Sequence, residues 1–246
     1  MKNKMFVAIA MLAVGLLTLN GEALATKKVY SPHVVKGEFE LETRGSYDFD
    51  DEDEKDGAQK QKYAVGYGVN DFWFTEVYGE IGKAPQDDFV FEAIDWENRF
   101  QLSEPGEWFI DTGLYFEYEF GVEDEASDKI EGKLLLEKQV GDFDHILNLI
   151  LEKEVGPNAE EDLEGGIAWS SRYRLKPWFE PGVEWHSDFG ELGEGSSFDQ
   201  QKHQFGPVVY GKISDHIKYD VGYFFGVSEA APDGQLKWIV EFEWHF

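Results

Sequence analysis

Residues 236–246 read LKWIVEFEWHF, and this stretch decides the fold class. Apolar residues occupy every second position from Leu236 to the C-terminal Phe246, and most of the positions between them are charged or polar. Successive side chains of a β-strand point to opposite faces, so a period of two predicts a strand with one apolar and one polar face. The segment is therefore expected to lie between an apolar medium and a polar one.

The same alternation recurs along most of the chain. The segment 108–120 shows it most regularly, whereas Phe89 and Phe91 fall on the face opposite to Ile94 and Trp96, which predicts a β-bulge or inward aromatic side chains there. Residues 147–151 would also allow a short buried helix, although the glutamates that follow favour a strand. Twelve strands are predicted, near residues 36–49, 63–69, 73–82, 89–102, 108–120, 129–139, 145–155, 163–175, 179–185, 205–213, 217–227 and 236–246.

The connections between these strands alternate in length. Short turns are expected near residues 70, 104, 141, 177 and 215, and longer polar or acidic loops begin near residues 50, 83, 121, 156, 187 and 228. This pattern predicts an all-β, transmembrane, antiparallel up-and-down β-barrel of about 12 strands, which forms the single domain 26–246. The alternative is a soluble barrel of the lipocalin type with its apolar face inward, but twelve strands exceed that class.

The first residues have the pattern of a cleaved secretory signal peptide. Lys2 and Lys4 precede an almost wholly apolar run over 5–19, and Ala23-Leu24-Ala25 offers a small-x-small cleavage site. We expect residues 1–25 to be removed. A membrane anchor would need about 20 apolar residues, and this run is shorter. No later stretch approaches the 18 or so consecutive apolar residues that would predict a transmembrane helix.

A leader followed by a closing strand that stops on an aromatic residue resembles Gram-negative outer-membrane β-barrels. The phrases WFEPG (178–182) and QFGP (204–207) are similar to those of uncharacterised proteobacterial porin-like or transporter-like barrels. This resemblance implies export through the periplasm to the outer membrane, with both termini on the periplasmic side. It also implies contacts with membrane lipid, lipopolysaccharide and the barrel-assembly machinery, and an assembly signal formed by Phe242, Trp244 and Phe246.

Composition excludes several functions. The formal net charge is -28, from 50 acidic and 22 basic residues, so binding of nucleic acid through phosphate contacts is not expected. Cysteine is absent, which excludes disulfides and thiolate metal sites. The histidines show no metal-ligand spacing, so neither a metal site nor a cofactor is predicted. The sequence leaves the oligomeric state open.

If the apolar face meets lipid, the other face lines the lumen. The basic residues expected there include Arg44, Arg99, Arg172 and Arg174. Acidic residues are more numerous on this face and include Glu38, Glu40, Glu42, Glu117, Glu119, Glu180, Glu184, Glu241 and Glu243.

Barrel closure brings the last strand beside the first and gathers five of these carboxylates, which attract metal ions or cationic solutes. They are Glu38, Glu40, Glu42, Glu241 and Glu243. Arg172 and Arg174 are expected across the lumen, where they would set up a transverse field as charged rings do in selective pores.

Three functional interpretations follow. Barrels of 8 strands are usually packed shut and those of 16 to 18 hold a channel, so twelve strands allow either arrangement. The first interpretation is a passive, cation-preferring diffusion channel for small solutes. The second is a plugged barrel with a structural or accessory role beside a partner protein. A phospholipid-acting enzyme is the third, because His145 and Ser171 share outward parity on neighbouring strands. The H-x-S spacing of outer-membrane phospholipases and an orienting Asn are missing, so enzymatic activity is not predicted.

Overall fold

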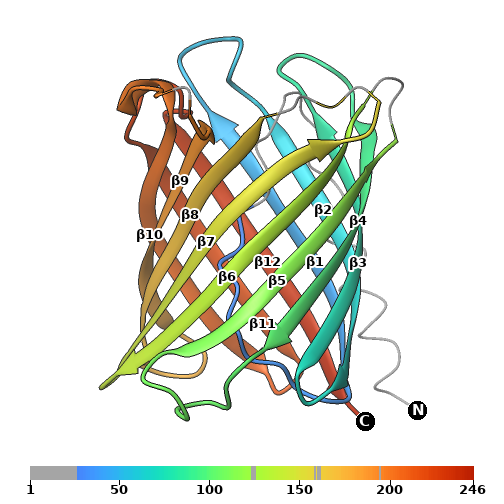
Figure 1. Cartoon of the computed structure of the whole chain (residues 1–246). Helices are drawn as coiled ribbons and strands as arrows, with labels where there is room; N and C mark the ends of the chain where they lie inside the picture. Colours follow the sequence, from blue (N-terminus) through green and yellow to red (C-terminus); the bar gives the residue numbers. More distant parts are fainter. Residues whose placement is uncertain (1–26, 123–125, 158, 160–161, 194) are drawn as a thin grey trace, which may run out of the picture.

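The computed structural model describes residues 27–246 except 123–125, 158, 160–161 and 194. Twelve strands in this part of the chain form one closed antiparallel barrel, in which β12 pairs with β1 (Figure 1). The predicted number of strands and the fold class are confirmed. The strands are β1 (Glu38–Phe49), β2 (Gln59–Asn70), β3 (Trp73–Lys83), β4 (Val90–Gln101), β5 (Asp111–Gly121), β6 (Asp128–Val140), β7 (Phe143–Val155), β8 (Leu163–Tyr173), β9 (Glu180–Glu191), β10 (Lys202–Ser214), β11 (Ile217–Gly226) and β12 (Gly234–His245).

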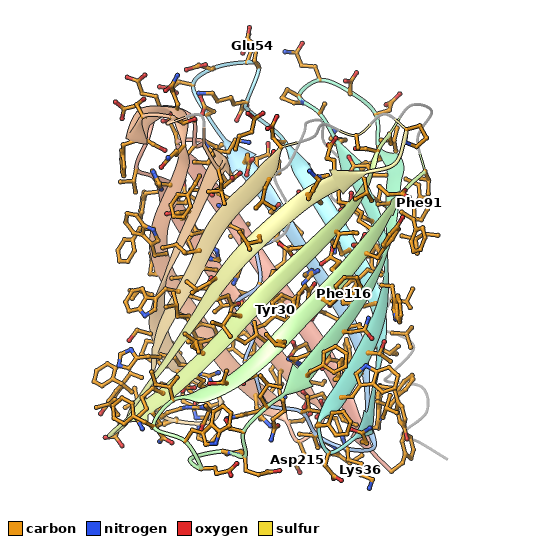
Figure 2. All side chains as sticks on the ribbon, viewed as in Figure 1. Tyr30, Lys36, Glu54, Phe91, Phe116 and Asp215 are labelled. Carbon is orange, nitrogen blue, oxygen red and sulfur yellow. The ribbon has the colours of Figure 1, made fainter. Side chains whose placement is uncertain are left out.

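The barrel has two different ends. We call the end with the short connections and the C-terminus the turn end, and the end with the longer connections the loop end (Figure 1). Figure 2 shows Lys36 and Asp215 at the turn end and Glu54 at the loop end. Strand β12 runs from the loop end to the turn end, where the Phe246 amide donates a hydrogen bond to the Gly37 carbonyl over 3.1 Å.

The burial of side chains is inverted relative to a water-soluble barrel. Large apolar residues such as Val65, Trp96 and Phe225 are exposed on the outer face, whereas charged residues such as Glu40 and Lys62 are buried on the inner face. An outer apolar surface and a polar interior are the arrangement of a β-barrel in lipid. No helix among the described residues is long and apolar enough to cross a membrane.

The irregularity expected in the fourth strand is a β-bulge. The register of β3 against β4 shifts between Glu80 and Ile81, so that Glu92 is passed over. As a result Phe91 and Ile94 are both exposed on the outer face. The alternative of inward aromatic side chains at Phe91 is wrong.

Several strand limits differ from the predictions. Strand β9 extends to Glu191 instead of ending near 185, because residues up to 188 pair with β10, residues up to 191 pair with β8, and the turn begins only at Leu192. Strand β2 begins at Gln59, before the apolar alternation is visible. Strand β5 begins at Asp111, since residues 105–110 form turns and bends. The stretch 147–151 lies within strand β7, so the helical alternative is wrong.

The outer face provides a stability test. Val65 lies in the middle of β2 and Val140 at the turn end of β6, and they are 53% and 57% exposed. We expect Val65→Arg to destabilise the barrel in lipid by about 2–4 kcal/mol, and Val140→Arg by about 0–1 kcal/mol, because the cost of a charge on the lipid face falls with distance from the midplane. Urea unfolding in phospholipid vesicles measures both; equal losses would contradict a membrane-spanning outer face.

Candidate functional site

The inner face of the barrel is a network of buried ion pairs. Lys62 Nζ lies 2.5 Å from Glu80 and 2.7 Å from Asp95, and Lys237 Nζ lies 2.9 Å from Glu184. An unpaired buried charge costs several kcal/mol. Pairing of this kind stabilises a polar wall on which the inward carboxylates otherwise outnumber the cations.

The structure brings the five carboxylates of β1 and β12 together at the turn end. Glu40 lies opposite Glu243 in the register of the two strands, and Glu42 lies opposite Glu241. Glu38 lies opposite His245, with 3.9 Å between the carboxylate and the imidazole Nδ1. Lys218 of β11 forms an ion pair with Glu243. One wall of the lumen is therefore strongly acidic at this end.

The two arginines of the expected basic wall are neutralised by nearby carboxylates. Arg172 and Arg174 lie 2.8 Å and 2.7 Å from Asp144 of the adjacent strand β7, and each lies 3.5 Å from Glu180. Arg174 follows the last residue of β8 at the turn end. Because these charges are balanced on their own side of the barrel, the transverse field expected from the sequence is not supported.

A feature that the sequence analysis missed occupies the lumen. Residues 27–37, which we call the N-terminal segment, run inside the barrel towards the turn end (Figure 1). Tyr30 lies at mid-height (Figure 2) and is 4% exposed. Its amide donates to Asn148 Oδ1 over 2.8 Å, and its carbonyl accepts from Asn148 Nδ2 over 2.9 Å. Its hydroxyl donates to Glu97 over 2.8 Å and accepts from Arg44 over 2.6 Å.

Further contacts hold the N-terminal segment along its length. Lys28 donates a hydrogen bond to Glu42 and lies 2.9 Å from Glu241. The Ser31 hydroxyl donates to Glu137 over 2.5 Å, and the Val34 amide donates to Gln101 over 2.8 Å. The partners belong to strands on opposite sides of the barrel. The segment therefore spans the lumen instead of lying along one wall.

Two inner-face glycines make room for this segment. A Cβ atom on Gly68 would lie 1.9 Å from the Val35 carbonyl oxygen, and one on Gly113 would lie 2.8 Å from the Pro32 Cβ. Any larger side chain would displace the segment. Residues 27–37 show no strand alternation that would have placed them. The sequence signal for a segment inside the lumen was the surplus of inward carboxylates, which require additional cations.

A line of glutamates crosses the inner face from strand to strand. Each member lies directly opposite the next in the register of neighbouring strands, except that Gly66, which has no side chain, stands between the second and third. Like charges directly opposite one another destabilise a sheet, so an arrangement repeated over nine strands points to a function. We call this set the glutamate ladder: Glu243, Glu40, Glu76, Glu97, Glu117, Glu131, Glu152 and Glu164.

The glutamate ladder climbs from one end of the barrel to the other. Glu243 lies near the turn end of β12, and Glu164 lies near the loop end of β8. The exposed fraction of the side chain is 2% at Glu243 and 3% at Glu97, and it rises to 15% at Glu131 and 30% at Glu152. The glutamates of the ladder are thus exposed to solvent towards the loop end and buried towards the turn end, where the N-terminal segment packs.

A cavity of about 410 Å³ lies on the loop-end side of Tyr30. Four members of the ladder line it, Glu117, Glu131, Glu152 and Glu164, together with Glu119. In all, eight basic and six acidic residues line this space, and two of the basic ones are Lys27 and Lys28 of the N-terminal segment. Without that segment the basic and acidic groups around the cavity would be equal in number.

The pair considered for a lipid-acting site lies on the outer face. His145 and Ser171 are directly opposite each other on β7 and β8. The imidazole is nearly parallel to the rings of Phe143 and Trp169, at interplanar angles of 10° and 8°. No hydrogen bond between the two side chains is present within the described part of the chain, so the geometry of an activated serine is not assembled.

Comparison with known proteins places the fold. No family model and no curated protein sequence matches the chain. The COG4313 outer membrane channel from Pseudomonas putida F1 is similar in structure, with a TM-score of 0.63 at 11% identity, covering 91% of this chain and 100% of that one. The NanC porin has a TM-score of 0.57 at 10% identity, covering 84% and 100%. The chain has the fold of Gram-negative outer-membrane channels.

The contacts of Tyr30 provide a test of how the N-terminal segment is held. Asn148→Ala leaves the amide and carbonyl of Tyr30 without their partners, a loss of about 1–3 kcal/mol. We expect the fraction of molecules whose N-terminal segment has left the lumen to rise by roughly 5- to 150-fold. The rate of trypsin cleavage after Lys27 and Lys28 in the folded barrel measures this fraction. The control is Asn98→Ala, a buried asparagine whose side chain contacts Trp73 instead. Equal cleavage of both variants would contradict the assignment.

Proposed function

We propose that the protein is a passive diffusion channel of the outer membrane for small solutes, that it prefers cations, and that its N-terminal segment closes the turn-end half of the lumen. The observation that carries this proposal is the glutamate ladder, which leads from the cavity at the loop end to the acidic wall of β1 and β12. The similarity in fold to outer-membrane channels supports it.

Cation preference follows from where the charges lie. Rings and rows of carboxylates in a pore lower the energy of cations and raise that of anions. When the N-terminal segment lies in the lumen, which we call the seated state, Lys28 offsets part of the negative potential of these carboxylates, because it contacts Glu42 and Glu241. When the N-terminal segment withdraws, Lys27 and Lys28 leave with it, and the open lumen becomes more negative.

The chain connectivity allows such a withdrawal. Removal of residues 1–25 as a signal peptide would leave Lys27 one residue from a free end. A free end can leave a barrel without breaking the ring of strands. In this proposal the turn end faces the periplasm, the outer face contacts lipid and lipopolysaccharide, and Phe242, Trp244 and Phe246 form the signal read by the assembly machinery. No catalytic step is proposed.

The second candidate is a plugged barrel with a structural or accessory role. It is favoured by the extent of the ion-pair network and by the hydrogen bonds of Tyr30, which join opposite walls. Both candidates share the seated N-terminal segment. They differ in whether removing the segment opens a path.

Deletion of residues 27–36 separates the two candidates. We expect the deletion variant, refolded without residues 1–25 and studied in a planar bilayer, to conduct severalfold more than the intact chain, because the contacts of Lys28, Tyr30 and Ser31 with the walls are gone. A matched control removes residues 50–56 from the exposed loop between β1 and β2. A deletion variant that folds and never conducts would establish the plugged barrel.

Charge selectivity has its own test. Replacing Glu117, Glu131 and Glu152 with Gln removes three carboxylates of the ladder that line the cavity. We expect the reversal potential in a salt gradient to move from a cation-selective value towards zero. The control makes the same three-charge change at exposed loop positions, Glu52, Glu54 and Glu229. If both triple variants shift the potential equally, selectivity comes from the loops and the role of the ladder is contradicted.

A further inference from the structure

Three carboxylates of the acidic wall surround a cation that the chain itself supplies. One oxygen each of Glu40, Glu42 and Glu241 lie within 4.8 Å of one another, the arrangement of ligands around a metal ion. The ammonium of Lys28 lies 2.9 Å from Glu241 and 3.9 Å from Glu40, and it is hydrogen-bonded to Glu42. Lys28 therefore occupies a position where carboxylate oxygens converge.

A fourth carboxylate nearby is not satisfied by this ammonium. Glu76 is 4% exposed, and its Oε1 has no hydrogen-bond partner among the described residues. It is the next member of the ladder after Glu40, and its Oε1 reaches towards Gly66, which stands opposite Glu40: a Cβ atom on that glycine would lie 3.1 Å from this oxygen. Among the surrounding charges, Lys28 acts on it most strongly. A buried carboxylate oxygen without a partner is costly, so this wall can accept more positive charge than Lys28 brings.

The chemistry of the four groups fits a hard divalent cation. Ca²⁺ takes 6 to 8 oxygen ligands from carboxylates that bind through one or both oxygens, in flexible geometry. Four carboxylates offer oxygens of this kind, and their formal charge exceeds that of the cations paired with them, Lys28 and Arg44, whose Nε lies 3.6 Å from Glu42. We propose that Glu40, Glu42, Glu76 and Glu241 form a Ca²⁺ site for which Lys28 is a built-in competitor, so that Ca²⁺ binding and the seated N-terminal segment exclude each other.

This competition would regulate the channel. Two cations that need the same oxygens weaken each other's binding by the same factor. Ca²⁺ would favour withdrawal of the N-terminal segment, and removal of Ca²⁺ would favour the closed lumen. The regulatory consequence rests on the proposed function, whereas the cation site itself does not.

The experiment measures Ca²⁺ binding to the refolded chain without residues 1–25, by equilibrium dialysis against radioactive Ca²⁺. We expect Lys28→Ala to bind one Ca²⁺ more tightly than the unchanged chain by at least about fivefold, because the competitor is absent. The matched control is Lys36→Ala, since Lys36 belongs to the same segment but is exposed, and its ion pair among the described residues is with Asp71, 3.5 Å away. We expect this control to bind as the unchanged chain does.

A second substitution tests the ligands. Adding Glu241→Gln to Lys28→Ala should abolish the gain, whereas adding Glu229→Gln, in an exposed loop, should leave it. If Lys28→Ala binds no more tightly than Lys36→Ala, or if its gain survives Glu241→Gln, the site is overturned. Should Lys28→Ala not refold, as judged by its shift on unheated gels, Lys28→Gln takes its place and the same outcomes decide.

The two proposals fail separately in this design. Dialysis reports Ca²⁺ binding whether or not the barrel conducts. Tighter binding by a barrel that conducts in none of its variants would leave the Ca²⁺ site standing and refute the channel. A conducting barrel whose Ca²⁺ binding is unaffected by Lys28→Ala would leave the channel standing and refute the Ca²⁺ site.

Discussion

The pairing of β1 with β12 is the constraint on which the rest of the structure depends. It closes the sheet, so that no strand edge is exposed to lipid, where unpaired backbone groups cost several kcal/mol each. Its register also places Glu40 opposite Glu243 and Glu42 opposite Glu241. Closure thus creates an acidic wall whose carboxylates repel one another. Cations that offset this repulsion include Lys218 from the neighbouring strand, Lys28 from the N-terminal segment, and Arg44, which lies 3.6 Å from Glu42.

The same register connects structure to transport. Because inward side chains of adjacent strands meet directly, eight glutamates form a ladder across nine strands, interrupted only at Gly66 of β2, from the closed turn end to the cavity near the loop end. The N-terminal segment interrupts this path at Tyr30, whose hydrogen bonds reach Arg44 and Glu97 on one side and Asn148 on the other. The proposed channel opens by withdrawing the N-terminal segment, which polar contacts hold against the walls above a row of glutamates.

The sequence predicted the barrel well because membrane strands have a strict period of two. It assigned the twelve strands and the inward parity of Glu38, Glu117 and Glu184, and it located the bulge near Phe91. It missed what depends on register between strands and on contacts across the lumen. The ladder exists only when Glu76, Glu97 and Glu131 are aligned, and no local pattern reveals that alignment. The position of residues 27–37 was equally hidden, since their contacts reach residues more than 100 positions away, as Tyr30 does with Asn148.

The most direct test locks the N-terminal segment reversibly in place. The chain has no cysteine, and the Ser31 hydroxyl of the N-terminal segment lies 2.5 Å from Glu137 of β6, so a Ser31→Cys, Glu137→Cys variant brings two thiols close enough to be joined oxidatively, directly or through a short reducible cross-linker. Single-channel conductance of this one protein, recorded first oxidised and then reduced, compares the tethered and free segment. The account predicts a low conductance when oxidised and a larger, cation-selective one after reduction. The same conductance and reversal potential in both states would contradict it.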